Sequence, residues 1–230
     1  MSDLDTNIRD RLVSVAQGVS GACPLIWPII SEAIGQLIPN QRLDRVVSFL
    51  KTLEEDFAQV QSRLDWIERN SATPEGLDIL EEGMLQAARS VSKDRQKWLA
   101  AIVGSSLSSE SLKYNESRKL LNLYRELADP ELIWLIYISG PQAYSSSYHK
   151  ELSDQYRDIL NPASRGYGMS QEEADRSALQ DGYKNTLLRL GLATLKQNGQ
   201  ALEISPLGRL LVRYISDGGE LKRREDTVSL

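Results

Sequence analysis

The sequence has 230 residues, of which 41% are hydrophobic and 26% are charged, and its formal net charge is −5. This composition is typical of a globular protein with a real core, and it excludes a fibrous or intrinsically disordered chain. The negative charge argues against strong non-specific nucleic-acid binding, which requires a positive field. The single cysteine, Cys23, excludes an intramolecular disulfide and a cysteine-based metal site. It also favours a reducing compartment, so we expect a cytoplasmic protein.

The most apolar stretch, residues 22–38, is too short and too interrupted by prolines to predict a membrane-spanning helix. Its apolar residues come in pairs and form one broad face of a helix. Such a face either lies on a membrane or packs into the core of a bundle. Membrane-surface helices usually carry basic residues on the polar side, and none occurs between Arg11 and Arg42. The core helix is therefore the favoured interpretation, and membrane contact is the alternative.

A long helix is predicted over residues 41–69, because its apolar residues alternate in steps of three and four. This heptad seam consists of Leu43, Val46, Leu50, Leu53, Phe57, Val60, Leu64 and Ile67. The seam needs a partner, which is either the rest of the chain or a second copy. Predicted helices 22–38 and 74–90 flank it and favour an internal partner. Val47, Phe49 and Trp66, off the seam line, are then the candidate residues for self-association.

Two further helices complete a predicted N-terminal helical bundle over residues 1–108. Thr73-Pro74-Glu75 is a strong helix start, with a capping hydroxyl, a proline in the first turn and an early acid. Ser92 is the expected cap of the next helix, which ends near Leu107. The short polar run from Ser105 to Ser111 is the best candidate for a domain linker.

The following region, residues 112–217, is predicted to be a second helical domain. Asp129-Pro130-Glu131 repeats the helix-start pattern before the continuously apolar run 132–138, which we interpret as a buried helix rather than a strand. Another helix is expected at 149–160. The loops on either side of it contain Tyr144, Tyr148 and Tyr167, which form a candidate loop interface, because tyrosine is frequent at protein interfaces.

The end of this domain has a recognisable pattern. A helix over 171–190 is expected to stop at Gly191, and residues 193–205 form two short strands around Asn198-Gly199, a strong hairpin signal. Pro206 then begins a last helix. Together these elements resemble a winged-helix domain over roughly residues 116–217, with the hairpin as the wing. We predict a disordered tail at 218–230.

Winged helices often bind DNA, so the resemblance implies candidate contacts to DNA or to a partner. They are Arg176, Gln180, Lys184 and Asn185 on the recognition helix, with Lys196 and Asn198 on the wing. The same helix carries four acidic residues against three basic ones, whereas a helix that enters a phosphate-lined groove should be basic. DNA binding is therefore disfavoured, and protein docking is preferred.

The N-terminal half is also similar to small helical proteins of bacteria and their phages. The similarity lies in the segment Ile38-Pro-Asn-Gln-Arg42 before a long helix. It implies an origin rather than an activity.

Sequence motifs for catalysis are weak. His149 is the single histidine in the sequence. The sequence contains neither of the nucleotide-binding glycine motifs G-x-x-x-x-G-K-(S/T) and G-x-G-x-x-G. We read the paired carboxylates as solvated helix faces and expect no catalytic residue, cofactor or metal. The predicted protein is mainly α-helical and non-enzymatic, with interaction or regulatory roles. It would self-associate through the N-terminal helices and dock a protein partner through the C-terminal domain. The alternatives are a DNA-binding regulator and a membrane-acting bacterial defence effector that uses helix 22–38.

Overall fold

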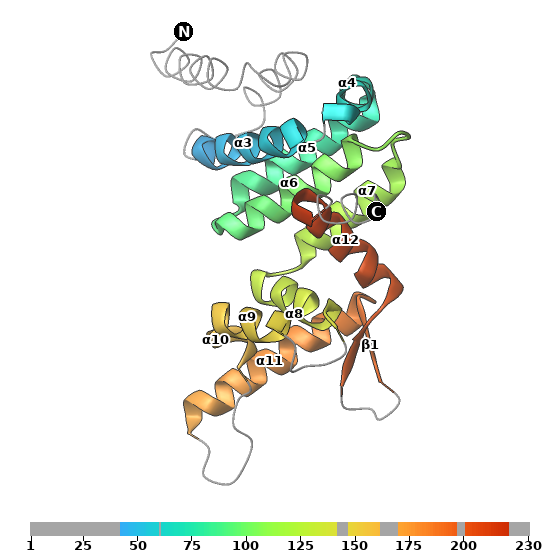
Figure 1. Ribbon diagram of the computed structural model, residues 1–230. Helices are drawn as coiled ribbons and strands as arrows, with labels where there is room; N and C mark the ends of the chain where they lie inside the picture. The colour runs from blue at the N-terminus through green and yellow to red at the C-terminus, as the bar shows by residue number, and fades with distance from the viewer. Residues whose placement is uncertain (1–41, 60, 142–146, 162–169, 197–200, 221–230) are drawn as a thin grey trace. The chain divides into compact units, whose positions relative to one another are not determined.

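The computed structural model describes residues 42–59, 61–141, 147–161, 170–196 and 201–220. These residues are mainly helical and include one small antiparallel hairpin (Figure 1). They divide into two compact units. The first unit holds the described residues up to Arg125 and those from Tyr214 onward, and the second holds Glu126–Arg213. The predicted helix 22–38 lies outside the described residues.

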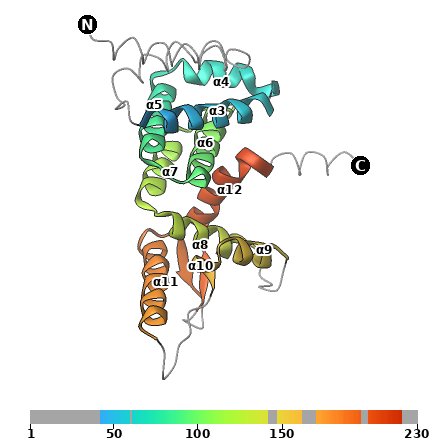
Figure 2. The same ribbon diagram turned by 90° about the vertical axis from the view of Figure 1, so that its left-hand side faces the viewer.

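The first unit is a helical bundle. Its elements are α3 (Leu43–Gln59), the 3₁₀ turn η2 (Gln61–Arg63), α4 (Leu64–Ser71), α5 (Pro74–Arg89), α6 (Lys93–Leu107) and α7 (Tyr114–Glu126). Helix α3 packs against both α6 and α5, and α5 also packs against α6 (Figures 1 and 2). The bundle core therefore forms between these three helices.

Four residues of the predicted heptad seam lie in α3 and are buried inside this bundle, which supports the internal-partner interpretation. Val46, Leu50, Leu53 and Phe57 are all at most 4% exposed. Leu53 and Phe57 both lie against Gly104 on α6, where an added β-carbon would be 3.4 Å and 3.8 Å from their side chains. Burying such a row of apolar side chains is the main source of stability in a helical bundle.

The prediction of one continuous helix over 41–69 is wrong. Helix α3 ends at Gln59, and η2 precedes the separate helix α4. Helix α4 packs on both α5 and α6. There the buried Asn70 amide donates hydrogen bonds of 2.8 Å to the carbonyls of Leu107 and Ser109. These hydrogen bonds stabilise the separate helix α4. Their contribution outweighs the small free-energy gain from continuing one helix through residues 61–63.

Helices α5 and α6 begin where the sequence predicts. Thr73 caps α5 by accepting a hydrogen bond from the Gly76 amide, and Pro74 follows it. Ser92 caps α6 by accepting one from the Arg95 amide. Each cap satisfies a backbone donor that the helix itself leaves unpaired.

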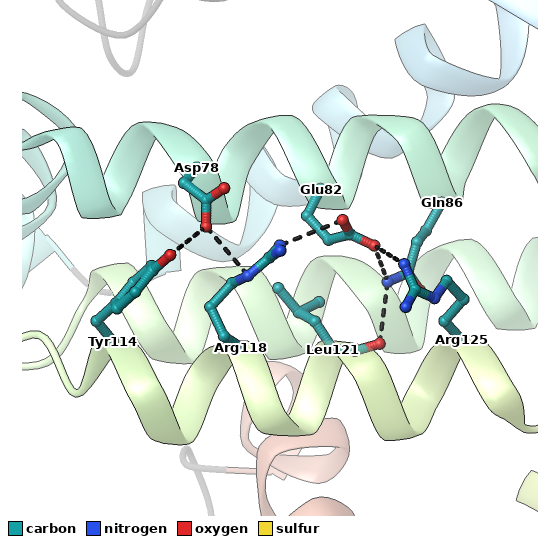
Figure 3. Close-up of polar contacts among 7 residues, drawn as sticks. All are labelled: Asp78, Glu82, Gln86, Tyr114, Arg118, Leu121 and Arg125. Carbon is teal, nitrogen blue, oxygen red and sulfur yellow. Dashed lines mark hydrogen bonds and ion pairs between the residues drawn. The ribbon is translucent and has the colours of Figure 1, made fainter.

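Helix α7 belongs to the first unit, so the predicted division at residues 108–112 lies inside that unit. A row of polar contacts joins α7 to α5 (Figure 3). The Tyr114 hydroxyl donates to Asp78 at 2.8 Å. Arg118 pairs with Asp78 at 3.1 Å and with Glu82 at 3.2 Å. The hydrogen bond to Asp78 raises the pKa of Tyr114.

The opposite end of α7 is fastened to α6. Tyr124 is fully buried, and its hydroxyl donates to the Arg95 carbonyl at 2.5 Å. The Arg95 guanidinium in turn donates to the Tyr124 carbonyl at 3.0 Å and lies 4.7 Å from the centre of the Tyr124 ring. The short polar run from Ser105 to Ser111 is therefore not a domain boundary. The contacts of Tyr114, Arg118 and Tyr124 hold the next helix, α7, in the first unit.

Replacing Arg118 with alanine should destabilise the first unit by about 1–2 kcal/mol, because Asp78 and the mostly buried Glu82 lose their shared cation. Urea unfolding followed by circular dichroism measures the change. Arg157→Ala is the matched control, since Arg157 forms an ion pair with Asp154 in which both side chains are more than half exposed. That variant should change the free energy of unfolding by less than about 0.5 kcal/mol. Equal losses in the two variants would contradict the assigned role of Arg118.

Asp56 on α3 makes the stability of the first unit pH-dependent. Burial, helped by the neighbouring Glu55 charge, raises the pKa of Asp56 to about 6. Because the folded state holds this proton more tightly than the unfolded state, the free energy of unfolding should fall as pH rises from about 4 to about 6. Asp56→Asn should therefore be more stable than the wild type at pH 7. We expect a gain of about 1 kcal/mol, allowing for solvent screening of a partly exposed carboxyl, and no gain near pH 4. Urea unfolding at both pH values checks this, and an equal gain at each would contradict it.

The second unit contains the hairpin. Its elements are α8 (Asp129–Ser139), α9 (Ser147–Gln155), α10 (Arg157–Leu160), α11 (Gln171–Arg189), β1 (Ala193–Leu195), β2 (Leu202–Ile204) and the first part of α12 (Pro206–Glu220). The run 132–138 is helical, as predicted, and Leu132 and Leu135 are fully buried. The predicted helix 149–160 is instead two helices. Helix α12 continues through 218–220, the first residues of the predicted tail, and the rest of that tail lies outside the described residues.

Candidate interaction surface on helix α11

Helix α11 is the longest helix of the second unit and lies at its edge (Figures 1 and 2). A capping box begins it: Ser170 accepts from the Glu173 amide at 3.3 Å, and Glu173 accepts from the Ser170 amide at 3.0 Å. The hydrogen bonds from Ser170 lower the pKa of Glu173. The helix is thus fixed at its start by residues next to it in sequence.

Gly191 ends α11 and turns the chain into the hairpin. Its φ of 71° lies in the left-handed region, which is easily reached only without a side chain. Its amide donates to the Leu188 carbonyl at 3.0 Å, and the Leu192 amide donates to the Leu187 carbonyl at 2.9 Å. This arrangement satisfies carbonyls at the helix end, as expected for the predicted glycine stop.

The hairpin pairs Ala193 with Ile204, Thr194 with Glu203 and Leu195 with Leu202. Ser205 closes the junction at its base. The Ser205 hydroxyl donates to the Gly191 carbonyl at 2.6 Å and accepts from the Gly208 amide at 3.0 Å. Because β2 also contacts α8 and β1 contacts α11, the hairpin and both helices form one packed group.

The inner face of α11 is used for packing. Leu187 is fully buried, and Gln180 is 5% exposed. The Gln180 amide donates to the carbonyls of Ile159 and Asn161 at 2.9 and 2.7 Å, which holds the end of α10. The Lys184 ammonium lies 4.5 Å from the centre of the Trp134 ring on α8, a cation–π contact.

The outer face of α11 points to solvent and has a different character. Five exposed residues lie along it: Glu172, Asp175, Leu179, Gly182 and Arg189. Leu179 is 57% exposed, unusual for a large apolar side chain in the described part of this protein. A β-carbon added to Gly182 would meet nothing within 4 Å. An exposed leucine beside an open glycine is a suitable contact surface for another helix.

These positions revise the predicted contacts to DNA or to a partner. Gln180 cannot be such a contact, because it is buried and bonded to α10. Lys184 faces Trp134, and Arg176 is half-buried. Asn185 on α11 is exposed, and Lys196, which follows β1, is half-buried. Asn198 lies outside the described residues.

Not all of the predicted self-association residues are accessible. Phe49 is fully buried, and its ring would lie 3.2 Å from a β-carbon at Gly83 of α5, so its assignment to an exposed flank is wrong. The reason is that α3 packs against two helices at once, which buries a wider face than the heptad line. Val47 and Trp66 are half-buried.

The predicted tyrosine loop interface is also changed. Tyr148 lies in α9 rather than in a loop, and its hydroxyl donates to the Ile136 carbonyl at 2.8 Å. Its ring packs edge-on against the buried His149. Tyr148 therefore joins α9 to α8. Tyr144 and Tyr167 lie outside the described residues.

A small cavity lies between the end of α8 and the hairpin, with His149, Lys196, Glu203 and Arg209 among its lining residues. Its volume is about 60 Å³. That is room for about two water molecules, whereas ligand sites usually measure about 300–1,000 Å³. The cavity is too small for a cofactor.

Comparison of the chain with protein-family models, with curated proteins and with solved structures gave no match. Within the described ranges, no helix is both long and apolar enough to cross a membrane. The same ranges hold no cluster of three or more histidine, cysteine or acidic residues that could bind a metal ion.

The sequence analysis missed the outer face of α11. A signal was present, because Glu172, Asp175, Leu179 and Gly182 are spaced three and four apart and Arg189 follows seven residues later. The pattern is hard to recognise, since leucine is the single large apolar residue in it. Only the packing of Gln180 and Lys184 against other helices shows which face of α11 is free.

Proposed function

We propose that the chain is a cytoplasmic, non-enzymatic interaction protein whose second unit docks a protein partner through the outer face of α11. In this proposal the helices and hairpin of the second unit have a winged-helix-like arrangement, with α11 in the position of the recognition helix. The single cysteine in the sequence is consistent with a reducing compartment.

The outer face of α11 is the observation that carries this proposal. It exposes an apolar leucine and an open glycine between two acidic residues and one basic residue. A DNA-reading helix would place lysine and arginine toward the phosphates. Of the predicted helix contacts, Gln180 and Lys184 instead face inward. The solvent-facing side therefore suits a protein surface better than a nucleic acid.

Self-association through the first unit, the other part of the proposal, has less support. The heptad residues of α3 already pack against α5 and α6, and Phe49 is buried beside them. Val47 and Trp66 are the residues that a second copy would contact there. The second unit is therefore the better place to look for a partner.

Photo-crosslinking tests the proposal. A photo-reactive phenylalanine analogue is placed at Leu179, and at the exposed Glu151 of α9 as the control. Irradiation of cells that make the protein should give a discrete protein adduct from position 179 and none from position 151. Mass spectrometry identifies the adduct. A nucleic-acid adduct at position 179, or no difference between the two positions, would overturn the proposal.

A further inference from the structure

One stripe along the outer face of α11 has the spacing of a coiled-coil seam. Its steps alternate between three and four residues, and the seam consists of Glu172, Asp175, Leu179, Gly182, Thr186 and Arg189. In such a seam the side chains project from one stripe of the helix toward a neighbouring helix. In the described part of the chain this stripe is exposed to solvent except at Thr186, which is half-buried.

The order of charges along this seam is self-complementary when two copies run antiparallel. Glu172 of each copy then lies opposite Arg189 of the other, and the twofold symmetry makes this ion pair occur twice. Asp175 lies opposite Thr186, so no like charges meet. In a parallel pair each Glu172 would face the other Glu172, which is unfavourable. The charges thus favour the antiparallel arrangement.

The same register places Leu179 of one copy against Gly182 of the other. Leu179 is 57% exposed, and the space beside Gly182 is open. A glycine within a helix costs about 1 kcal/mol relative to alanine, and nothing within the described chain prevents an alanine there. A leucine from a neighbouring helix that packs beside Gly182 explains why position 182 has no side chain.

From these observations we infer that the partner of α11 is a second copy of this chain, with the two α11 helices paired antiparallel through this seam. The inference rests on the proposed function, in which the outer face of α11 is a docking surface. It adds the identity of the partner, the direction of pairing and the contacts.

Competing contacts make this a weak, reversible dimer. Arg189 already pairs with Glu126 at 4.0 Å, but both side chains are at least half exposed, so the pair is easily exchanged. Thr186 donates to the Gly182 carbonyl at 3.2 Å, and Gln171 donates to Asp175 at 2.8 Å, within α11. One helix pair buries less area than a standard interface.

Sedimentation velocity on the full chain tests the charge pairing, at concentrations from about 1 µM to about 1 mM, where weak interfaces dissociate. The wild type should show a reversible monomer–dimer equilibrium. Glu172→Arg and Arg189→Glu should each raise the dissociation constant of the dimer by at least about tenfold, because two attractive ion pairs become repulsive. The double variant should return to within about threefold of the wild type. A monomeric wild type, or a double variant as weak as the single ones, would overturn the inference.

A second variant separates association from folding. Gly182→Leu fills the place of the incoming Leu179, so it should weaken the dimer by at least about tenfold without lowering resistance to urea. Asn185→Leu, a neighbouring exposed position outside the seam, should not weaken the dimer. An unchanged dimer in Gly182→Leu would contradict the register. If crosslinking at position 179 captures a different protein and the wild type is monomeric, the inference fails while the proposed function stands.

Discussion

Replacing Leu53 with aspartate should unfold the first unit. Leu53 is 2% exposed and faces Gly104 of α6 across the centre of the bundle. The variant loses a buried leucine and places an unpaired charge in the core, at a combined cost of about 5 kcal/mol or more. That cost is comparable to the whole stability of a typical domain.

Circular dichroism and urea unfolding measure this effect. Lys51→Asp, at an exposed position of the same helix, is the control and should remain folded. A folded, monomeric Leu53→Asp protein would instead mean that the α3 seam is used between copies of the chain.

The second large effect is expected at Gly208, in the first turn of α12. A β-carbon there would lie 2.1 Å from the Leu192 carbonyl oxygen and 2.9 Å from Ile204. The backbone at the base of the hairpin cannot move away without breaking the bonds that Ser205 makes. We expect Gly208→Ala to destabilise the second unit by about 3 kcal/mol.

Gly182→Ala is the matched control, because it makes the same substitution in a helix of the same unit. The open space at Gly182 predicts the opposite sign, a gain of about 1 kcal/mol. Urea unfolding, with hydrogen exchange of the hairpin amides, distinguishes the two. Similar effects in both variants would show that helix propensity, rather than the close approach to Leu192, controls position 208.

Local signals made much of the fold predictable. Thr73-Pro74 and Ser92 mark the starts of α5 and α6, and Gly191 marks the end of α11, because each acts on backbone groups a few residues away. For α8 the prediction of a helix required only a small correction. The backbone amide that donates a hydrogen bond to the Glu131 side chain belongs to Ala128, one residue before the Asp129-Pro130-Glu131 pattern.

The parts that depend on packing were not predictable in this way. The break after Gln59 follows from the contacts of α4 with α5 and α6, which a single heptad pattern does not contain. Phe49 is buried because α3 contacts two helices. The outer face of α11 is defined by the residues that pack on the other side, Gln180 and Lys184, and these were expected to be exposed.

The most direct measurement of antiparallel α11 pairing is the distance between spin labels on two copies. The label is placed at the exposed Gln171, in a chain whose single cysteine is changed by Cys23→Ser. In the proposed register, the two labelled positions are about 28 Å apart along the helix axes, and the helices are about 10 Å apart. The account therefore predicts a label distance of about 30 Å, which Gly182→Leu abolishes. A distance near 10 Å would indicate parallel pairing. That result, or no distance at any concentration, would contradict the account.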